Sequence, residues 1–148
     1  MRRTLSVILF IFGAWVLASE IMIMFIDVGQ PPATALAMVG ILLAASAPFL
    51  LAGTWTSPGN RFSDLGITIV IAAGVGGGCA LAMFLMLNDP NFLLLLPLES
   101  PARNMRFVLF PGVVNLIVIA TVGWLLWNTG RRRQKRKLAE IGQVFGDE

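Results

Sequence analysis

Four long apolar runs dominate the pattern of hydrophobic and polar positions along the chain. Each run has about twenty residues, and twenty helical residues at about 1.5 Å each cover the roughly 30 Å hydrocarbon core of a bilayer. The runs are continuous and do not alternate with a period of two, which favours helices over the strands of a membrane β-barrel. We therefore predict an all-α, polytopic membrane protein, a four-transmembrane-helix bundle. The predicted spans are residues 5–26, 34–53, 65–87 and 107–127.

Composition agrees with a lipid environment. The chain has 148 residues, of which 57% are hydrophobic and 13% are charged, and its mean hydropathy is +0.82. Soluble domains are usually about 45–50% apolar, with about 25% charged residues. The four spans and their short connections leave no room for a soluble domain. We expect one transmembrane domain over residues 1–130 and a basic cytoplasmic tail over residues 131–148.

Basic residues divide unequally between the two ends of the predicted bundle. With four spans, nine of the eleven fall on one side and two on the other. The side rich in Lys and Arg is normally cytoplasmic, so we predict an integral plasma (inner) membrane protein with both termini in the cytoplasm. The nine are Arg2, Arg3, Arg61, Arg131, Arg132, Arg133, Lys135, Arg136 and Lys137, and the two are Arg103 and Arg106.

The N-terminus also has features of a secretory signal peptide. Residues 1–3 are positively charged, residues 5–17 are apolar, and Val16-Leu17-Ala18 fits the small-residue pattern of a cleavage site. Apolar residues resume at once and continue to Ile26, which makes the run longer than a typical signal. We therefore expect the segment to remain in the protein as its first span.

Several groups used in catalysis and metal binding are absent from the sequence. There is no histidine, and Cys79 is the single cysteine. This excludes, within the chain, a haem with histidine ligands, a histidine zinc site, a serine–histidine triad and an intramolecular disulfide. The acidic and basic residues outside the spans show no recognisable catalytic spacing. We expect a protein that is not an enzyme and has no cofactor or metal site.

Small residues recur every four positions in the second and third spans. Because small side chains let helix backbones approach closely, this pattern favours helix packing inside the chain or against a partner. Four glycines within residues 74–78 exceed what an ordinary span needs, so a wall against a lipid tail or pigment, or a groove for another subunit, remains open. The predicted packing or partner positions are Gly40, Ala44, Gly74, Gly78, Ala82 and, in the fourth span, Asn115.

Two carboxylates lie on one face of the first predicted span. Glu20 and Asp27 are seven residues apart, and Gly13 is seven residues before Glu20. Asp27 is at the outer membrane boundary, whereas Glu20 is inside the span, where ionisable side chains are costly and usually face the bundle or a cavity. One hypothesis makes Glu20 and Asp27 a proton or cation site. The other makes Glu20 a structural carboxyl, either neutral or paired with Arg103, Arg106 or a partner chain.

The tail begins with a cluster of six basic residues. Each is expected to add about 1 kcal/mol of attraction to an anionic leaflet, so anionic-lipid binding is predicted. Nucleic-acid binding is disfavoured, because the membrane already explains a basic cluster next to a span. Apolar residues then recur at helical spacing, which favours a short amphipathic helix. The six are Arg131, Arg132, Arg133, Lys135, Arg136 and Lys137.

Together these features favour a small integral subunit, assembly factor or scaffold of a larger membrane protein complex, without catalysis. Its expected partners are the lipid bilayer, anionic lipids, and either other membrane subunits or further copies of this chain. The alternative is a small proton- or cation-coupled transporter, or a transporter subunit, that uses Glu20.

Overall fold

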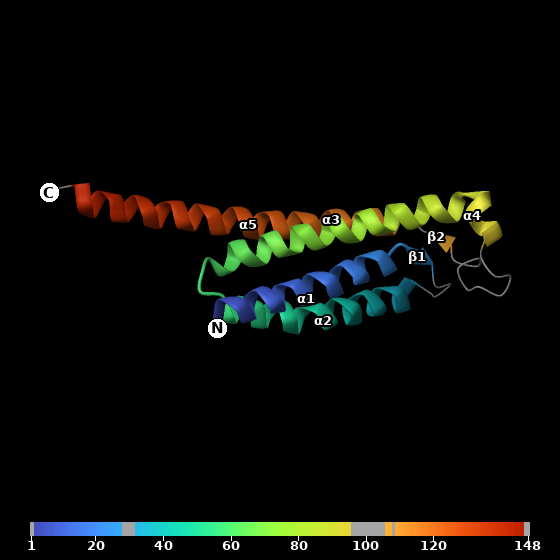
Figure 1. Cartoon of the computed structure of the whole chain (residues 1–148), viewed down its shortest axis with the longest axis horizontal. Helices are drawn as coiled ribbons and strands as arrows, with labels where there is room; N and C mark the ends of the chain where they lie inside the picture. The colour runs from blue at the N-terminus through green and yellow to red at the C-terminus, as the bar shows by residue number, and fades with distance from the viewer. Residues whose placement is uncertain (1, 28–31, 96–105, 108, 147–148) are drawn as a thin grey trace.

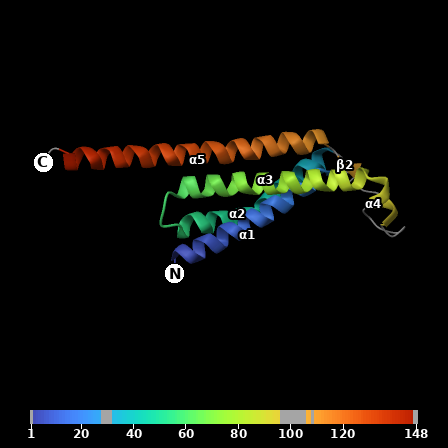
Figure 2. The ribbon, with the colours of Figure 1, turned by 45° about the horizontal axis from the view of Figure 1, so that its top comes forward.

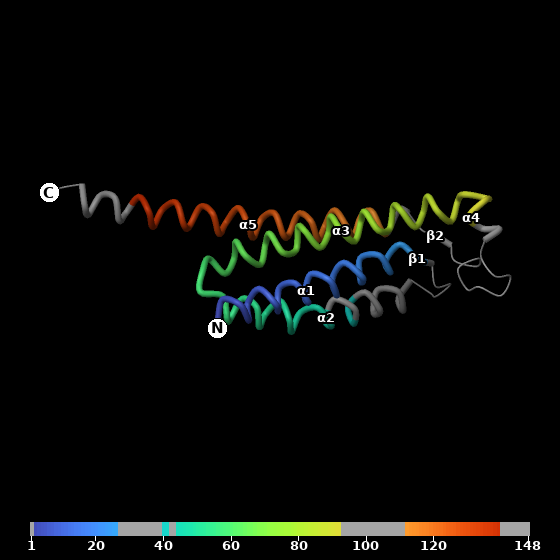
Figure 3. Tube along the Cα trace, viewed as in Figure 1, coloured from blue at the N-terminus to red at the C-terminus, as the bar shows by residue number. Residues whose placement is uncertain are grey.

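The fold is all-α, apart from two very short strands. The computed structural model describes residues 2–27, 32–95, 106–107 and 109–146 (Figure 1). Within these ranges, side chains are described except at residues 27, 32–39, 42, 43, 93–95, 106, 107, 109–111 and 140–146 (Figure 3). The elements in chain order are α1 (Arg2–Ile23), β1 (Ile26–Asp27), α2 (Pro32–Thr56), α3 (Arg61–Asn88), α4 (Pro90–Leu95), β2 (Arg106–Phe107) and α5 (Leu109–Gly146).

Three helices are long and apolar enough to cross a bilayer. They are α1 with 22 residues, α3 with 28 residues, and the 28-residue stretch Gly112–Ala139 of α5. A span needs about 20 residues, so each has the necessary length. α2 is a further helix of 25 residues without a charged side chain.

The four long helices form an open row rather than a closed bundle (Figures 1 and 2). α1 packs against both α2 and α3, and α3 packs against α5. α2 and α5 therefore lie at opposite edges of the row. The expected bundle is corrected in this respect: α1 and α2 are antiparallel neighbours, as are α3 and α5, but α1 lies between α2 and α3, and the row does not close on itself.

Most basic residues gather at one end of the molecule, which we call the basic end. The N-terminus, the α2–α3 connection and the second half of α5 all lie there (Figure 1). α5 continues without a break from the apolar segment into the tail, and its 38 residues measure about 57 Å at 1.5 Å per residue. The amphipathic helix expected in the tail is therefore the end of one long helix and not a separate element.

Glycines bring the α3 and α5 backbones into direct contact. A Cβ atom placed on Gly66 would lie 2.6 Å from the carbonyl oxygen of Gly123 and 2.7 Å from the Cα atom of Trp127. A Cβ atom on Gly130 would lie 2.9 Å from the Cα atom of Ser63. A backbone cannot move aside as a flexible side chain can. Only a residue without a side chain therefore fits at these crossings.

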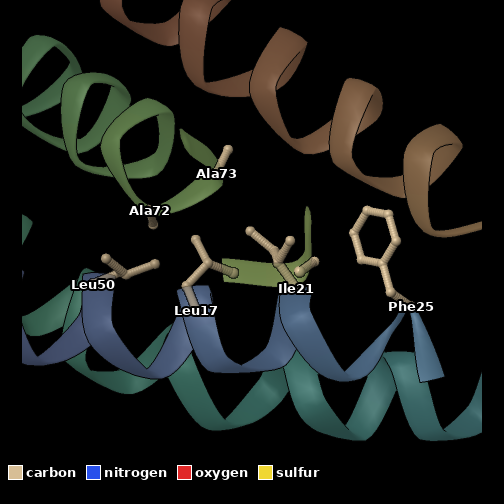
Figure 4. Close-up of a cluster of buried hydrophobic side chains, with 7 residues drawn as sticks. Leu17, Ile21, Phe25, Leu50, Ala72 and Ala73 are labelled. Carbon is tan, nitrogen blue, oxygen red and sulfur yellow. The ribbon is translucent and has the colours of Figure 1, made fainter. Parts of the chain in front are cut away.

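α1 lies inside the row and carries much of the apolar core. Its residue Ile21 is fully buried and faces α3 (Figure 4). A Cβ atom placed on Gly76 of α3 would lie 2.7 Å from the carbonyl oxygen of Ala18, so the two helices nearly touch at this point. The buried apolar cluster consists of Leu17, Ile21, Phe25, Leu50, Ala72, Ala73 and Ala80.

A two-residue antiparallel ladder joins the chain after α1 to the chain before α5, at the end opposite the basic end. Ile26 of β1 pairs with Phe107 of β2, and Asp27 pairs with Arg106. α1 itself ends at Ile23, three residues before the predicted end of the first span. The ladder therefore holds the first and last long helices in register although they pack little against each other.

Candidate functional site

Glu20 is the only charged side chain that is buried among the described residues, with 3% of its surface exposed. It lies in the last turn of α1, and Ser46 of α2 presents both its hydroxyl group and its backbone to the carboxyl group. Neither carboxyl oxygen has a hydrogen bond of regular geometry within the described part of the chain. The carboxyl group therefore keeps hydrogen-bonding capacity in a place that is closed to solvent.

The face of α1 that carries Glu20 packs against α2. A Cβ atom placed on Gly13 would lie 2.8 Å from the side chain of Leu50 and 3.3 Å from its backbone nitrogen. The hydroxyl group of Ser6 donates a hydrogen bond of 3.0 Å to the carbonyl oxygen of Gly53. Ser6, Gly13 and Glu20 are each seven residues apart and meet α2 in turn. This spacing therefore marks the α1–α2 interface.

Asp27 does not continue this helical face. α1 ends before it, and Asp27 lies in β1 opposite Arg106. The side chains of Asp27, Arg103 and Arg106 lie outside the described residues. A shared ion site of Glu20 and Asp27 stays a prediction, as does an ion pair of Glu20 with either arginine.

The predicted small-residue positions of α2 and α3 face away from the other helices of the chain. Around Gly40, Gly74 and Gly78, no neighbouring atom of the described residues lies within 4 Å of the place where a Cβ atom would be. Ala44 and Ala82 are also exposed. Packing of these positions inside the chain, which was one of their two expected roles, is not found in the described structure. Their contact with a partner stays a prediction.

Different glycines make the helix contacts within the chain. Gly66 and Gly77 of α3 face α5, and Gly76 faces α1. On α5, Gly123 and Gly130 face α3, and their spacing of seven residues was the available signal in the sequence. Consecutive helical residues point about 100° apart, so neighbouring glycines of one cluster serve different interfaces.

Asn115 is half-buried on α5, beside the contact with α3. It lies three residues after Gly112, where a Cβ atom would meet the ring of Phe25, and one residue before Leu116, which packs against Gly77. The amide makes no hydrogen bond to another described residue. Its expected hydrogen bond across helices stays a prediction.

Side-chain hydrogen bonds fasten the α2–α3 connection at the basic end. Ser57 donates a hydrogen bond of 2.6 Å to the carboxylate of Asp64, in the first turn of α3. The side-chain amide of Asn60 donates to the carbonyl oxygen of Gly130 on α5. The connection is therefore held by hydrogen bonds to α3 and to α5.

Two arginines of the tail lie over aromatic rings. The Arg131 guanidinium is 5.2 Å from the centroid of the Trp127 ring, and the Arg133 guanidinium is 4.9 Å from that of Phe62. Such cation–π contacts stabilise by about 0.5–1 kcal/mol at exposed sites. The first contact lies within α5, and the second helps to hold α5 against α3. All six basic residues predicted to bind anionic lipid are exposed, and this binding stays a prediction: Arg131, Arg132, Arg133, Lys135, Arg136 and Lys137.

The chemistry available to the described residues is limited. They contain no group of three or more His, Cys, Asp or Glu side chains that could hold a metal ion. Cys79 is a free, exposed thiol on α3. The polar contact that sequence reasoning missed is Ser46, because one serine within an apolar run gives no sign of which helix it faces.

No protein-family model matches the chain, and no curated protein or solved structure matches it either.

Proposed function

We propose that the protein is a non-catalytic integral membrane subunit, assembly factor or scaffold that binds another transmembrane segment along an exposed face of α3. The observation that carries the proposal is the contrast between glycines of this one helix. Gly66 and Gly76 lie at close helix crossings, whereas Gly74 and Gly78 have no neighbour within 4 Å. The open row of helices leaves this face uncovered by the described part of the chain.

Packing physics in lipid supports this role. Lipid tails are as apolar as leucine, so helices associate through close backbone approach and hydrogen bonds rather than through removal of apolar surface from water. Gly74 and Gly78 lie one helical turn apart and would let a partner helix come as near to α3 as α5 does at Gly66. A second copy of the chain and a different membrane subunit are both compatible with this contact.

We further infer that the chain crosses the membrane four times, with both termini in the cytoplasm. α2 supplies the fourth span because it has 25 residues and no charged side chain, and because it runs antiparallel to α1 and α3 (Figure 1). Nine of the eleven basic residues belong to segments at the basic end. The positive-inside rule then assigns the basic end to the cytoplasmic side of the plasma (inner) membrane.

Photo-crosslinking in native membranes tests the proposed docking face. A photoreactive residue in place of Leu81, which lies between Gly78 and Ala82 and is 57% exposed, should crosslink to another polypeptide. The control is Ile117 of α5, which is 59% exposed and lies at a similar depth, because its neighbour Leu116 contacts Gly77. Equal crosslinking from both positions, or none from Leu81, would contradict the proposal.

A transporter remains the second candidate, because the carboxyl group of Glu20 is buried without a regular hydrogen bond. Buried carboxyl groups in membrane proteins commonly bind protons or cations. Proton relay usually needs further ionisable groups along a path. No other charged side chain is buried among the described residues, which favours the scaffold.

Glu20→Gln separates the two candidates, since glutamine keeps the shape and hydrogen bonding of the side chain but cannot release a proton. We expect this variant to leave any pH-dependent ion flux in proteoliposomes unchanged. If Glu20 instead accepts bonds as an anion, the variant should weaken assembly. A variant that is assembled at wild-type levels, yet has lost its pH-dependent flux, would decide for the transporter.

A further inference from the structure

An apolar groove opens between α1 and α3 at the basic end. The two helices meet at Gly76 and Ala18. From there they diverge toward the basic end, as Figure 2 shows. The groove between them has a volume of about 690 Å³, which is within the range of about 300–1,000 Å³ usual for ligand sites. Its apolar walls are Val7, Phe10, Ile11 and Ala14 of α1 and Ile67 and Ile71 of α3.

The depth of the groove corresponds to one leaflet of a bilayer. Its lining on α1 runs from Arg3 to Ala14. At about 1.5 Å per residue this is about 16 Å, roughly half of the 30 Å hydrocarbon core. A second transmembrane helix would need a contact that continues across both leaflets, whereas a lipid chain occupies only one.

The mouth of the groove and the pocket beside it together carry an excess of positive charge. Arg3 lines the mouth of the groove. An adjoining pocket of about 540 Å³ shares the segment 57–59 with the groove. Arg2 and Arg61 line this second pocket. One carboxylate, Asp64, also lies at the mouth, where it accepts the hydrogen bond from Ser57. The groove lining alone has one guanidinium group and one carboxylate. Together with the adjoining pocket there are three guanidinium groups against one carboxylate, and this net positive charge attracts an anion.

The start of α3 adds to this attraction. The helix begins at Arg61, and its N-cap residue Asn60 makes no capping hydrogen bond with its side chain. The first N–H groups of a helix carry partial positive charge when no side chain caps them. Of this first turn, Arg61 lines the adjoining pocket and Asp64 lines the groove, where its carboxylate offsets part of the positive charge.

We propose that this groove binds one anionic phospholipid, with an acyl chain between α1 and α3 and its phosphate group at Arg2, Arg3 and Arg61. The apolar walls select a lipid over free phosphate, and the charged mouth with a depth of one leaflet selects it over a helix. The groove itself is lined by no residue of the basic tail, where attraction to the surface of the membrane needs no groove. Arg61 also lines a pocket with Arg133, Arg136 and Lys137 of the tail. The inference uses the proposed membrane placement but not the partner face of α3.

Native mass spectrometry of the full chain in mild detergent tests the site. We expect the wild-type protein to retain one phosphatidylglycerol in preference to phosphatidylcholine with the same acyl chains. Arg3→Gln should lower retention about tenfold, through loss of charge-assisted hydrogen bonds, while Arg3→Lys should keep most of it. The matched control is Arg132→Gln, which removes the same charge from the exposed tail and should leave retention unchanged.

A second pair of variants tests the apolar part of the groove. Ala14→Phe and Ile67→Trp each place bulk in the groove from a different wall, and each should lower retention while the thermal midpoint stays near that of the wild type. Equal losses from Arg3→Gln and Arg132→Gln would show diffuse charge attraction and overturn the proposal. Wild-type retention of the lipid by a folded groove-filling variant would also overturn the proposal. Detection of a bound peptide instead of the lipid would overturn it as well. Crosslinking at Leu81 is a separate readout, so failure of the lipid site and failure of partner docking can be told apart.

Discussion

Gly66→Ala is expected to destabilise the protein by about 2 kcal/mol or more, a large loss for one added methyl group. The new Cβ atom would lie 2.6 Å from the Gly123 carbonyl oxygen and 2.7 Å from the Trp127 Cα atom. Both are backbone atoms, so the collision can be relieved only by moving α5 away from α3. Thermal unfolding in detergent micelles, followed by circular dichroism, measures the loss as a lower midpoint.

The matched control is Gly78→Ala on the same helix. No neighbouring atom of the described residues lies within 4 Å of its Cβ position, so the methyl group meets no obstacle among them. Alanine is also favoured over glycine in a helix by about 1 kcal/mol, so this variant should unfold at the wild-type temperature or slightly above it. Equal midpoints for the two variants would contradict the assigned contact between α3 and α5.

The double variant Gly74→Leu/Gly78→Leu is expected to lose its complex with the proposed partner while the chain itself stays folded. The two leucines would point away from the neighbouring helices but would hold a partner helix away from α3, because close approach needs small residues. Loss of about 1.4 kcal/mol would reduce the bound partner about tenfold. Quantitative mass spectrometry of proteins that co-purify in mild detergent measures this change.

The control for assembly is Val113→Leu/Ile117→Leu on α5. These positions are also four residues apart, and both are exposed, so the control alters an uncovered helix face away from the proposed docking site. We expect it to co-purify with partner protein at the wild-type level. Normal assembly of the glycine double variant would mean that Gly74 and Gly78 face lipid, and the docking proposal would be wrong.

The existence of the long helices could be predicted from the sequence, because continuous apolar runs of span length admit few other structures in lipid. The prediction of an all-α fold is confirmed, and three of the helices have the length and apolarity of a span. The helix of the first predicted span ends at Ile23, three residues before the predicted end of that span. Ile26 is as apolar as the helix before it but belongs to β1.

Which face of each helix is buried could not be predicted in the same way. In a soluble helix, polar residues mark the exposed side, but in lipid both sides are apolar. Ile21 is fully buried and Ile117 is 59% exposed, although both are isoleucines within apolar runs. The glycines of α3 are equally ambiguous, so the sequence could not distinguish Gly76, at a helix crossing, from Gly78, on the open face.

The candidate site residues also differ in whether they could be predicted from the sequence. Glu20 could be singled out because a carboxyl group within an apolar run is costly wherever it lies. The sequence could not single out the neighbouring Ser46 or the groove beside Arg3. Both depend on how α1 meets α2 and diverges from α3. Close contacts at Gly13 and Gly76 lie where these helices meet, and no pattern within a single helix reveals them.

Cysteine labelling in intact cells tests the inferred topology, in which the chain crosses the membrane four times and both termini lie in the cytoplasm. After Cys79→Ala, single cysteines at Gln30 and Ser100 should react with a membrane-impermeant maleimide from outside. Cysteines at Gly59 and Glu148 should react only after the membrane is opened. Protection at Gly59 together with labelling at Gln30 would establish that α2 crosses the bilayer. Labelling of Gly59 or Glu148 from outside would contradict the topology, the orientation of the groove and the assignment of the basic end to the cytoplasm.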